Sequence, residues 1–315
     1  MKSIISKFVL TIIIIFIIGV YIQSSTENIY LIKSEEQIET ILEDEVDESQ
    51  KKEIYEDEID KNQNEEVYEN QEEILKENEL EEDNNRDYIN IDLEKVRIPI
   101  LMYHSISNDD PNNTLMIPIN MFKEQIEWLN TNGFTAMTMD ELLEAMETGR
   151  VPKRPVVITF DDGYADNYTN AFPILKDNNM KGTFFIITNV VDKNSYYMSS
   201  DMLKEMQEYG MVIENHTSNH VELNKLSREG ALQEIKDAQS FLREVIGSKG
   251  EYLCYPVGRY NDITIELAKE LGIKAAVTTK GGISCNSDGK HELKRVRISP
   301  MNIENFAEIF SEYIY

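Results

Sequence analysis

Two adjacent acidic residues, Asp161 and Asp162, follow a run of apolar and β-branched residues over 156–160 and precede Gly163. Neighbouring carboxylates repel each other, so a site that holds such a pair usually gives them different tasks, one binding a cation and the other handling a proton. The preceding run has the composition of a buried strand, and the glycine allows the backbone to turn after it. Asp-Asp-Gly is also ordinary turn chemistry, so the pair alone leaves a surface turn open.

Two histidines, His216 and His220, follow a second apolar run that begins at Met211. Their spacing of four residues predicts that both rings point the same way on a helical turn. Because Zn²⁺ favours imidazole nitrogen and carboxylate oxygen, one Asp with these histidines would form a three-ligand site with an open position for water. Without the acid pair, they would be interpreted as solvated loop histidines. Both groups follow strand-like segments, as in barrels that collect their chemistry at the carboxyl ends of strands.

The two motifs together resemble those of the polysaccharide deacetylases of carbohydrate esterase family 4, the NodB homology domain. Residues 159–163, Thr-Phe-Asp-Asp-Gly, are similar to the family's first motif, and residues 216–220, His-Thr-Ser-Asn-His, are similar to its His-Ser/Thr-x-x-His motif. The resemblance covers roughly residue 98 to the C-terminus. It implies that Asp162 joins the two histidines on a divalent metal and that Asp161 is the general base of an N-deacetylation.

The first predicted strand of this region ends in Met-Tyr-His at His104, which resembles the opening of one branch of these deacetylases. A lone histidine at a strand end is more often structural, so a role for it depends on the resemblance. The Leu-x-x-His motif that many members carry near the end is missing here. His104 is therefore the predicted replacement as catalytic acid, whereas His291 lies in a polar loop and is interpreted as solvated.

A Pro/Gly turn departs from the Arg-x-Pro-Tyr-Gly that is common in the family, because Cys254 stands at the arginine position and Val257 at the tyrosine position. Backbone N–H groups of such a turn can point at a ligand, and the Val257 N–H is the predicted oxyanion donor. The arginine at this position in the family usually orients the catalytic acid, and Arg295 is predicted to take over that orienting role. Tyr255 and Tyr164 are predicted to contact or orient the substrate.

The chain has two cysteines, Cys254 and Cys285. Export would permit a disulfide, but two cysteines do not make a disulfide framework. Free thiols are therefore the favoured interpretation.

Alternating strand and helix patterns predict the fold class, an α/β chain with parallel strands wound into a barrel, and the resemblance implies a distorted (β/α) barrel of about seven strands. Helices are predicted over 120–130, 139–147, 168–177, 200–209, 227–246, 263–271 and 302–310. Strands are predicted over 98–104, 156–160, 183–187, 274–278 and 293–298, and from residues 211 and 252 onward. Thr138 and Asp262 are the predicted N-caps of the second and sixth helices.

The charge of the chain is concentrated in one segment. Residues 34–94 hold 26 Asp and Glu against five Lys and Arg, a net charge of −21 out of −27 for the chain. Residues 27–94 are also nearly free of Gly and Pro, and such a composition predicts an acidic, disordered spacer, with an acidic tether for cationic polymer as the alternative. The balance does not indicate nucleic-acid binding. The catalytic domain is predicted over 95–315.

Residues 1–26 have the pattern of a membrane-targeting signal, since Lys2 and Lys7 precede an almost wholly apolar run over 8–22. No Ala-x-Ala cleavage pattern follows, which favours an uncleaved N-terminal hydrophobic helix that anchors an exported domain outside the membrane. The alternative is a cleaved signal peptide and a secreted protein.

The resemblance implies a metal-dependent hydrolase that removes N-acetyl groups from a polysaccharide containing N-acetylglucosamine, either an exopolysaccharide or peptidoglycan, at the cell surface. Zn²⁺ is the first choice of metal, with Co²⁺, Ni²⁺ and Fe²⁺ open. Three alternatives remain at this stage. They are a non-catalytic carbohydrate-binding protein on the same fold, a metal hydrolase of another non-peptide C–N bond, and a membrane-tethered interaction protein that uses the acidic segment.

Overall fold

The computed structural model describes residues 87–311. The predicted membrane segment 1–26 and nearly all of the predicted spacer lie outside these residues. Within the described part, every helix is too short or too polar to cross a membrane.

Seven parallel strands form a closed barrel. Around the barrel their order is β3, β14, β12, β11, β10, β9 and β8, and β8 pairs back with β3 to close it. The strands are β3 Ile100–Tyr103, β8 Pro155–Phe160, β9 Thr183–Ile186, β10 Val212–Asn215, β11 Tyr252–Cys254, β12 Ala275–Gly281 and β14 Leu293–Arg297. A register shift between Val277 and Gly281 on β12 distorts the closure. The predicted distorted barrel of parallel strands is confirmed.

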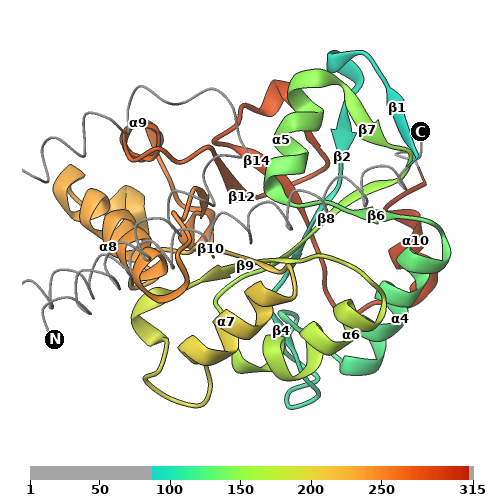
Figure 1. The fold of residues 1–315 in the computed structure, drawn as a ribbon, viewed down its shortest axis with the longest axis horizontal. Coiled ribbons are helices and arrows are strands. Elements are labelled where there is room, and N and C mark those ends of the chain that lie inside the picture. Colours follow the sequence, from blue (N-terminus) through green and yellow to red (C-terminus); the bar gives the residue numbers. More distant parts are fainter. Residues whose placement is uncertain (1–86, 312–315) are drawn as a thin grey trace, which may run out of the picture. The chain divides into compact units, whose positions relative to one another are not determined.

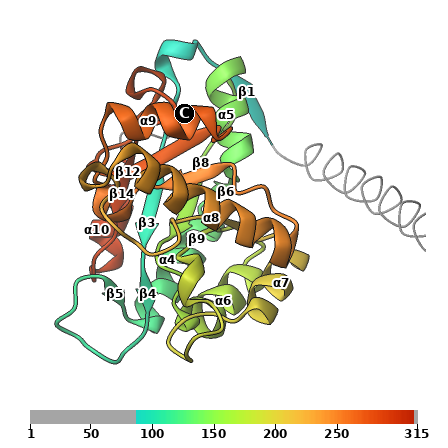
Figure 2. The same ribbon diagram turned by 90° about the vertical axis from the view of Figure 1, so that its left-hand side faces the viewer.

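Helices surround the barrel, as the two orthogonal ribbon views show (Figures 1 and 2). The helices are α4 Ile119–Thr131, α5 Met139–Thr148, α6 Phe172–Asp177, α7 Ser200–Glu208, α8 Arg228–Ile246, α9 Asp262–Glu270 and α10 Ile303–Glu308. Thr138 caps α5 as predicted, through a capping box with Glu141. The predicted cap of α9 is wrong by one residue, because the side chain of Asn261, not Asp262, accepts the Thr264 N–H.

Short strands flank the barrel. They are β1 Tyr88–Asn90, β2 Arg97–Ile98, β4 Ser105–Ile106, β5 Met116–Ile117, β6 Thr135–Ala136, β7 Arg150–Pro152 and β13 Ser284–Cys285. β2 and β3 form two strands where one was predicted, because Pro99 between them has no N–H to continue a ladder.

Cys254 and Cys285 are both buried free thiols.

The folded domain begins before residue 95, which corrects the predicted end of the acidic spacer. β1 lies within the range 27–94 and pairs antiparallel with β7. Its neighbourhood reads Tyr-Ile-Asn-Ile, and Ile89 and Ile91 pack on a buried cluster that includes Val96 and Val151. Alternating apolar residues at the end of the acidic segment therefore belong to the fold.

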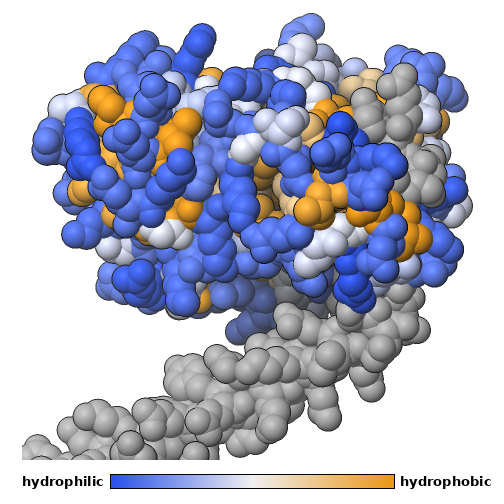
Figure 3. All heavy atoms as spheres, turned by 90° about the horizontal axis from the view of Figure 1, so that it is seen from above, coloured by the Kyte–Doolittle hydropathy of each residue, from blue (hydrophilic) through white to orange (hydrophobic). Residues whose placement is uncertain are grey.

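Apolar side chains fill the barrel and its contacts with the helices. Phe160 on β8 stacks on Phe184 on β9 with ring centroids 4.5 Å apart, and Tyr103 on β3 stacks on Phe160 at 5.4 Å. Tyr103 and Phe160 also pack against Phe122 on α4, so these rings lie between the barrel and its surrounding helices. The surface seen in Figure 3 is mostly hydrophilic, with apolar side chains gathered in separate areas.

Glu214 on β10 is a buried acid, and 5% of its surface is exposed. Its Oε2 accepts the Tyr252 N–H at 3.0 Å. The pKa of Glu214 is raised to about 8, chiefly by burial and also by Asp140 and Glu251, while the Tyr252 N–H and Lys274 act in the opposite direction. Between the ordinary pKa near 4.5 and pH 8, the folded protein keeps a proton that the unfolded chain releases, so the free energy of unfolding falls as the pH rises through this window.

Glu214→Gln removes this titration and keeps an acceptor for the Tyr252 N–H. We expect the Tm of the variant, relative to that of the wild type, to rise by at least about 3 °C from pH 5 to pH 9. About 1 kcal/mol corresponds to ~2–4 °C in a domain of this size. Thermal unfolding followed by circular dichroism across this range measures the difference. Parallel Tm profiles would contradict a proton held by Glu214.

Candidate active site

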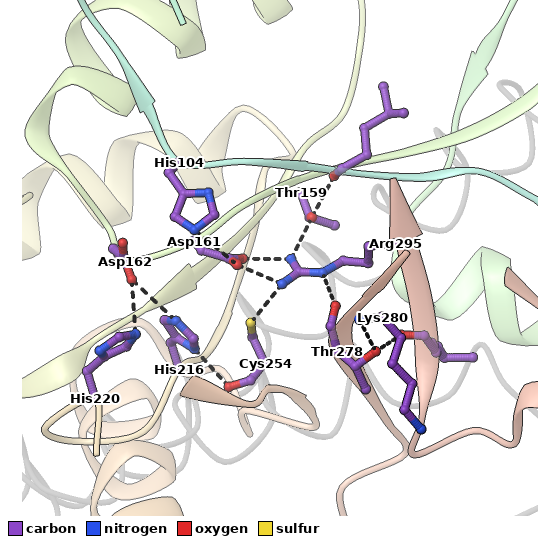
Figure 4. A network of polar contacts seen from close by, with 12 residues as sticks. His104, Thr159, Asp161, Asp162, His216, His220, Cys254, Thr278, Lys280 and Arg295 are labelled. Atoms are coloured by element: carbon purple, nitrogen blue, oxygen red, sulfur yellow. Dashed lines mark hydrogen bonds and ion pairs between the residues drawn. The ribbon is translucent and has the colours of Figure 1, made fainter. Parts of the chain in front are cut away.

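The acidic pair lies where β8 ends, and the backbone turns its two side chains apart. Asp162 has φ 74° and Gly163 has φ 80°, so two consecutive residues are left-handed. Asp161 still belongs to the ladder, because its N–H bonds to the Tyr103 carbonyl at 3.0 Å. The result is that Asp161 points towards Arg295 and Asp162 points towards the histidines (Figure 4).

The histidines lie in a loop after β10, and the predicted helical turn between them is wrong. Thr217 has φ 65° and His220 has φ 56°, both left-handed. Side chains supply the hydrogen bonds that a helix would take from its backbone, because Asn215 Oδ1 accepts the Thr217 N–H at 2.7 Å and Thr217 Oγ1 accepts the His220 N–H at 3.1 Å. Both rings still reach Asp162, with their centroids 4.8 Å apart.

Asp162, His216 and His220 form a cluster with the dimensions of a metal site. Asp162 Oδ1 lies 3.3 Å from His216 Nε2 and 3.4 Å from His220 Nε2. Two ligand atoms on a tetrahedral Zn²⁺ lie ~3.3–3.4 Å apart, given metal–ligand bonds of about 2.0–2.1 Å. His216 and Asp162 are buried, whereas His220 is half-buried and leaves one side of the cluster open.

The hydrogen bond of His216 shows which of its nitrogens faces the cluster as an acceptor. Nδ1 lies 2.8 Å from the Cys254 carbonyl oxygen, which can only accept, so Nδ1 carries a hydrogen. In the neutral ring, the Nε2 lone pair then faces the Asp162 carboxylate, an arrangement that needs a cation or a proton between them. Burial and His216 lower the pKa of His220, which favours the neutral, metal-binding form of that ring. These observations fit a divalent metal.

Arg295 on β14 holds Asp161 through a bidentate ion pair inside the barrel. Nη1 donates to Asp161 Oδ1 and Nη2 donates to Oδ2, each at 2.7 Å. The remaining guanidinium hydrogens go to Thr159 Oγ1 at 3.0 Å, the Thr278 carbonyl at 2.9 Å and Cys254 Sγ at 3.2 Å. All five donors of the buried guanidinium thus have acceptors, on strands β8, β11 and β12.

This ion pair determines the charge state of Asp161. Burial would raise the pKa of the carboxyl, but the Arg295 guanidinium outweighs burial and holds that pKa well below its usual range. The Asp161 carboxyl of the folded protein is therefore ionised at ordinary pH. Cys254 contacts the same guanidinium, so the cysteine at the family's arginine position accommodates an arginine that comes from another strand.

His104 lies beside Asp161 because β3 and β8 pair with Tyr103 opposite Phe160, so the next residues of both strands are neighbours. His104 Nε2 is 3.9 Å from Asp161 Oδ2, and 15% of the side chain is exposed. Burial lowers the pKa of His104, and the Asp161 carboxylate partly opposes that shift. His291, which was interpreted as solvated, is half-buried, and its Nε2 lies 2.9 Å from the Ile273 carbonyl oxygen.

The turn after β11 holds Val257 in a strained conformation, with φ 48° and a side chain that is 53% exposed. A positive φ is a genuine outlier for a β-branched residue and costs about 1–3 kcal/mol. Gly258 follows with φ 68°, and a Cβ there would lie 2.0 Å from Thr279 Oγ1, so only glycine fits. The strained turn lies at the carboxyl end of β11, next to β10, and the predicted oxyanion role of Val257 stays a prediction.

The prediction that Tyr255 contacts the substrate is wrong. Cys254 faces the barrel interior, so the next residue faces outward, and Tyr255 is fully buried against α8 and α9 with its ring 4.6 Å from that of Tyr260. Tyr164, by contrast, is half-buried beside Asp162. Burial and the Asp162 carboxylate raise the pKa of the Tyr164 phenol, so its hydroxyl stays protonated.

Sequence reasoning missed Thr159, Thr278 and the Cys254 thiol as partners of Arg295. The alternation of Thr159 with Asp161 on β8 was the available signal for the first of these, because residues two apart share a face. Asp161, His216 and Cys254 also lie close enough to suggest a second metal cluster. Arg295 already binds both Asp161 and Cys254, so this second group does not suit a cation.

A closed parallel barrel with an Asp-His-His cluster and a separately held carboxylate at its strand ends defines a NodB-type deacetylase. The polysaccharide deacetylase family model matches residues 148–276. The chain is 37% identical over 205 residues to YxkH of Bacillus subtilis, which is named for polysaccharide deacetylation, covering 65% of this chain and 72% of that protein. The chain therefore belongs to the polysaccharide deacetylase family.

Other similar proteins are also named as deacetylases. The chain is 29% identical over 225 residues to the poly-β-1,6-N-acetyl-D-glucosamine N-deacetylase of Staphylococcus epidermidis, covering 63% of this chain and 78% of that protein. Among solved structures, the deacetylase PplD of Streptococcus pyogenes in complex with acetate superimposes with a TM-score of 0.66 and 34% identity, over 68% of this chain and 98% of PplD.

Proposed function

We propose that this protein is a divalent-metal-dependent N-deacetylase of a polysaccharide that contains N-acetylglucosamine. The observation that carries the proposal is the Asp162-His216-His220 cluster, spaced as metal ligands are, with the ionised Asp161 beside it. A bound divalent metal would lower the pKa of a water molecule and polarise the acetyl carbonyl.

The chain's own residues supply the proton transfers. Asp161, held by Arg295, takes the proton of the attacking water as general base. His104 lies 3.9 Å from Asp161, so it passes the proton that Asp161 has taken from the water on to the departing amine. The Val257 N–H donates to the oxyanion. Tyr164 orients Asp162 from the rim of the site.

The substrate class we favour is a poly-β-1,6-N-acetylglucosamine exopolysaccharide over peptidoglycan. The names of the staphylococcal relatives support this choice. Acetate release from β-1,6-linked N-acetylglucosamine oligomers, chitin oligomers and peptidoglycan, each with Zn²⁺, Co²⁺, Ni²⁺ or chelator, tests substrate and metal together. Acetate release that chelator does not reduce would contradict metal dependence, and no release from any glycan would favour a binding protein.

His104→Ala is expected to lower kcat by about 10²-fold or more, because the leaving amine loses its proton donor. Metal affinity should stay within about threefold of the wild type, since His104 is not in the cluster. Turnover and bound metal measured on the same preparations decide this. His291→Ala is the matched control and should leave kcat unchanged; wild-type turnover in the His104 variant would remove His104 from the mechanism.

We further propose export, with the domain anchored outside the membrane by residues 1–26. The sequence pattern of these residues supports the proposal. Cell fractionation combined with mass spectrometry of the N-terminus tests it. An intact N-terminus in the membrane fraction is expected, whereas a shortened protein in the medium would favour the cleaved alternative.

A further inference from the structure

Three tyrosines gather beside the candidate metal ligand Asp162. Tyr164 follows it by two residues, and Tyr196 and Tyr197 lie in the segment between β9 and α7. Backbone hydrogen bonds join this segment to the turn that carries Asp162, since the Ala165 N–H donates to the Tyr196 carbonyl at 2.9 Å and the Met198 N–H donates to the Gly163 carbonyl at 3.0 Å. The tyrosines are thus fixed to the frame of the site.

The three rings brace one another. Tyr164 and Tyr197 are stacked, with centroids 5.5 Å apart and planes 22° apart. Tyr196 meets Tyr164 at 5.2 Å and Tyr197 at 5.3 Å, both nearly edge to face. Such pairs stabilise aromatic side chains beyond the area that they bury. Tyr196 is therefore held in place although it is 59% exposed.

Exposed aromatic rings are rare in residues 87–311, where only Tyr196 and Tyr209 are exposed. The two differ in their surroundings. Lys176 Nζ lies 3.4 Å from the centre of the Tyr209 ring, whereas the ring contacts of Tyr196 are with the two other tyrosines. Tyr209 also precedes β10 and so lies at the amino ends of the strands, opposite the active site.

We propose that Tyr196, braced by Tyr164 and Tyr197, is a stacking subsite for the pyranose ring adjacent to the sugar that loses its acetyl group. An exposed aromatic face suits the apolar C–H face of a sugar, and this contact depends on the ring and not on its hydroxyl. The subsite lies on the β8 and β9 side of the metal cluster, and the Val257 turn lies on the β11 side, so a glycan chain crosses the cluster between them. This inference rests on the proposed function and specifies how the polymer is positioned.

The test uses full-length protein and three variants, Tyr196→Ala, Tyr196→Phe and the matched control Tyr209→Ala. KM and kcat are measured on β-1,6-linked N-acetylglucosamine pentamer, and hydrolysis of p-nitrophenyl acetate reports the state of the metal site without using the subsite. We expect Tyr196→Ala to raise KM for the pentamer about five- to tenfold and to leave ester hydrolysis within about twofold. Tyr196→Phe and Tyr209→Ala should behave as the wild type.

Two results would overturn the subsite. One is a KM for the pentamer that is unchanged in Tyr196→Ala, and the other is an equal loss of ester hydrolysis, which would show that Tyr196 only supports the fold of the site. A wild-type protein that releases no acetate would instead overturn the proposed function. The subsite is then tested by pentamer binding to wild type and Tyr196→Ala, and equal dissociation constants would refute it.

Discussion

Asp161→Asn is expected to lose nearly all turnover while it keeps its metal. The amide cannot take a proton from water, and the loss of a general base lowers kcat by about 10²–10⁴-fold. Asp161 does not belong to the Asp162-His216-His220 cluster, and its two oxygens are bound by Arg295, so the variant should retain metal affinity within a few-fold. Acetate release and metal content, measured on one preparation, give both quantities.

His216→Ala is the comparison variant for this experiment, because it lacks a predicted metal ligand. It removes one of the three ligands of the cluster, so metal and turnover should fall together. Equal metal loss in the Asp161 and His216 variants would refute the division of labour between the two acids. A fully active Asp161→Asn protein would mean that another group accepts the proton.

Much of the barrel could be predicted because its local patterns agree with its tertiary structure. The buried strand before Asp161 and the apolar run before His216 both end where polar residues begin, and parallel strands bring such ends to one edge of the barrel. Two polar clusters 54 positions apart in sequence could therefore be expected to meet. The chemistry of the ligand types then predicted one Asp with the two histidines on the cation, and the family resemblance identified that Asp as Asp162.

Other features depend on contacts that no local pattern encodes. A spacing of four residues between the histidines is typical of a helical turn. The loop instead has left-handed residues at Thr217 and His220, and side-chain hydrogen bonds hold it. Tyr255 is predicted to contact or orient the substrate, but strand alternation turns it outward. The five hydrogen-bond acceptors around Arg295 come from three other strands and their ends. The sequence alone could predict only that Arg295 orients an acid.

Arg295→Met is expected to destabilise the protein by about 3–5 kcal/mol at neutral pH, because it leaves the Asp161 carboxylate buried without its partner. Arg295 holds the pKa of Asp161 below its ordinary value, so the wild type keeps this stabilisation above pH 4 and loses it only as the pH falls through the folded pKa. In the variant, burial still raises that pKa, and only the weaker effects of His104 and His216 oppose it. The difference in free energy of unfolding between the wild type and Arg295→Met should therefore be largest near pH 7 and smaller towards pH 4. Urea unfolding at several pH values measures this difference.

A second substitution separates the ion pair from the packing of the arginine stem. Asp161→Asn combined with Arg295→Met removes both charges, and a pair replaced as a unit costs less than a pair broken on one side. We expect the double variant to be more stable than Arg295→Met alone, and Arg297→Met, an exposed arginine on the same strand, to be unchanged. If the double variant were no more stable than Arg295→Met, the lost packing would account for the effect, and the electrostatic control of Asp161 by Arg295 would have to be abandoned.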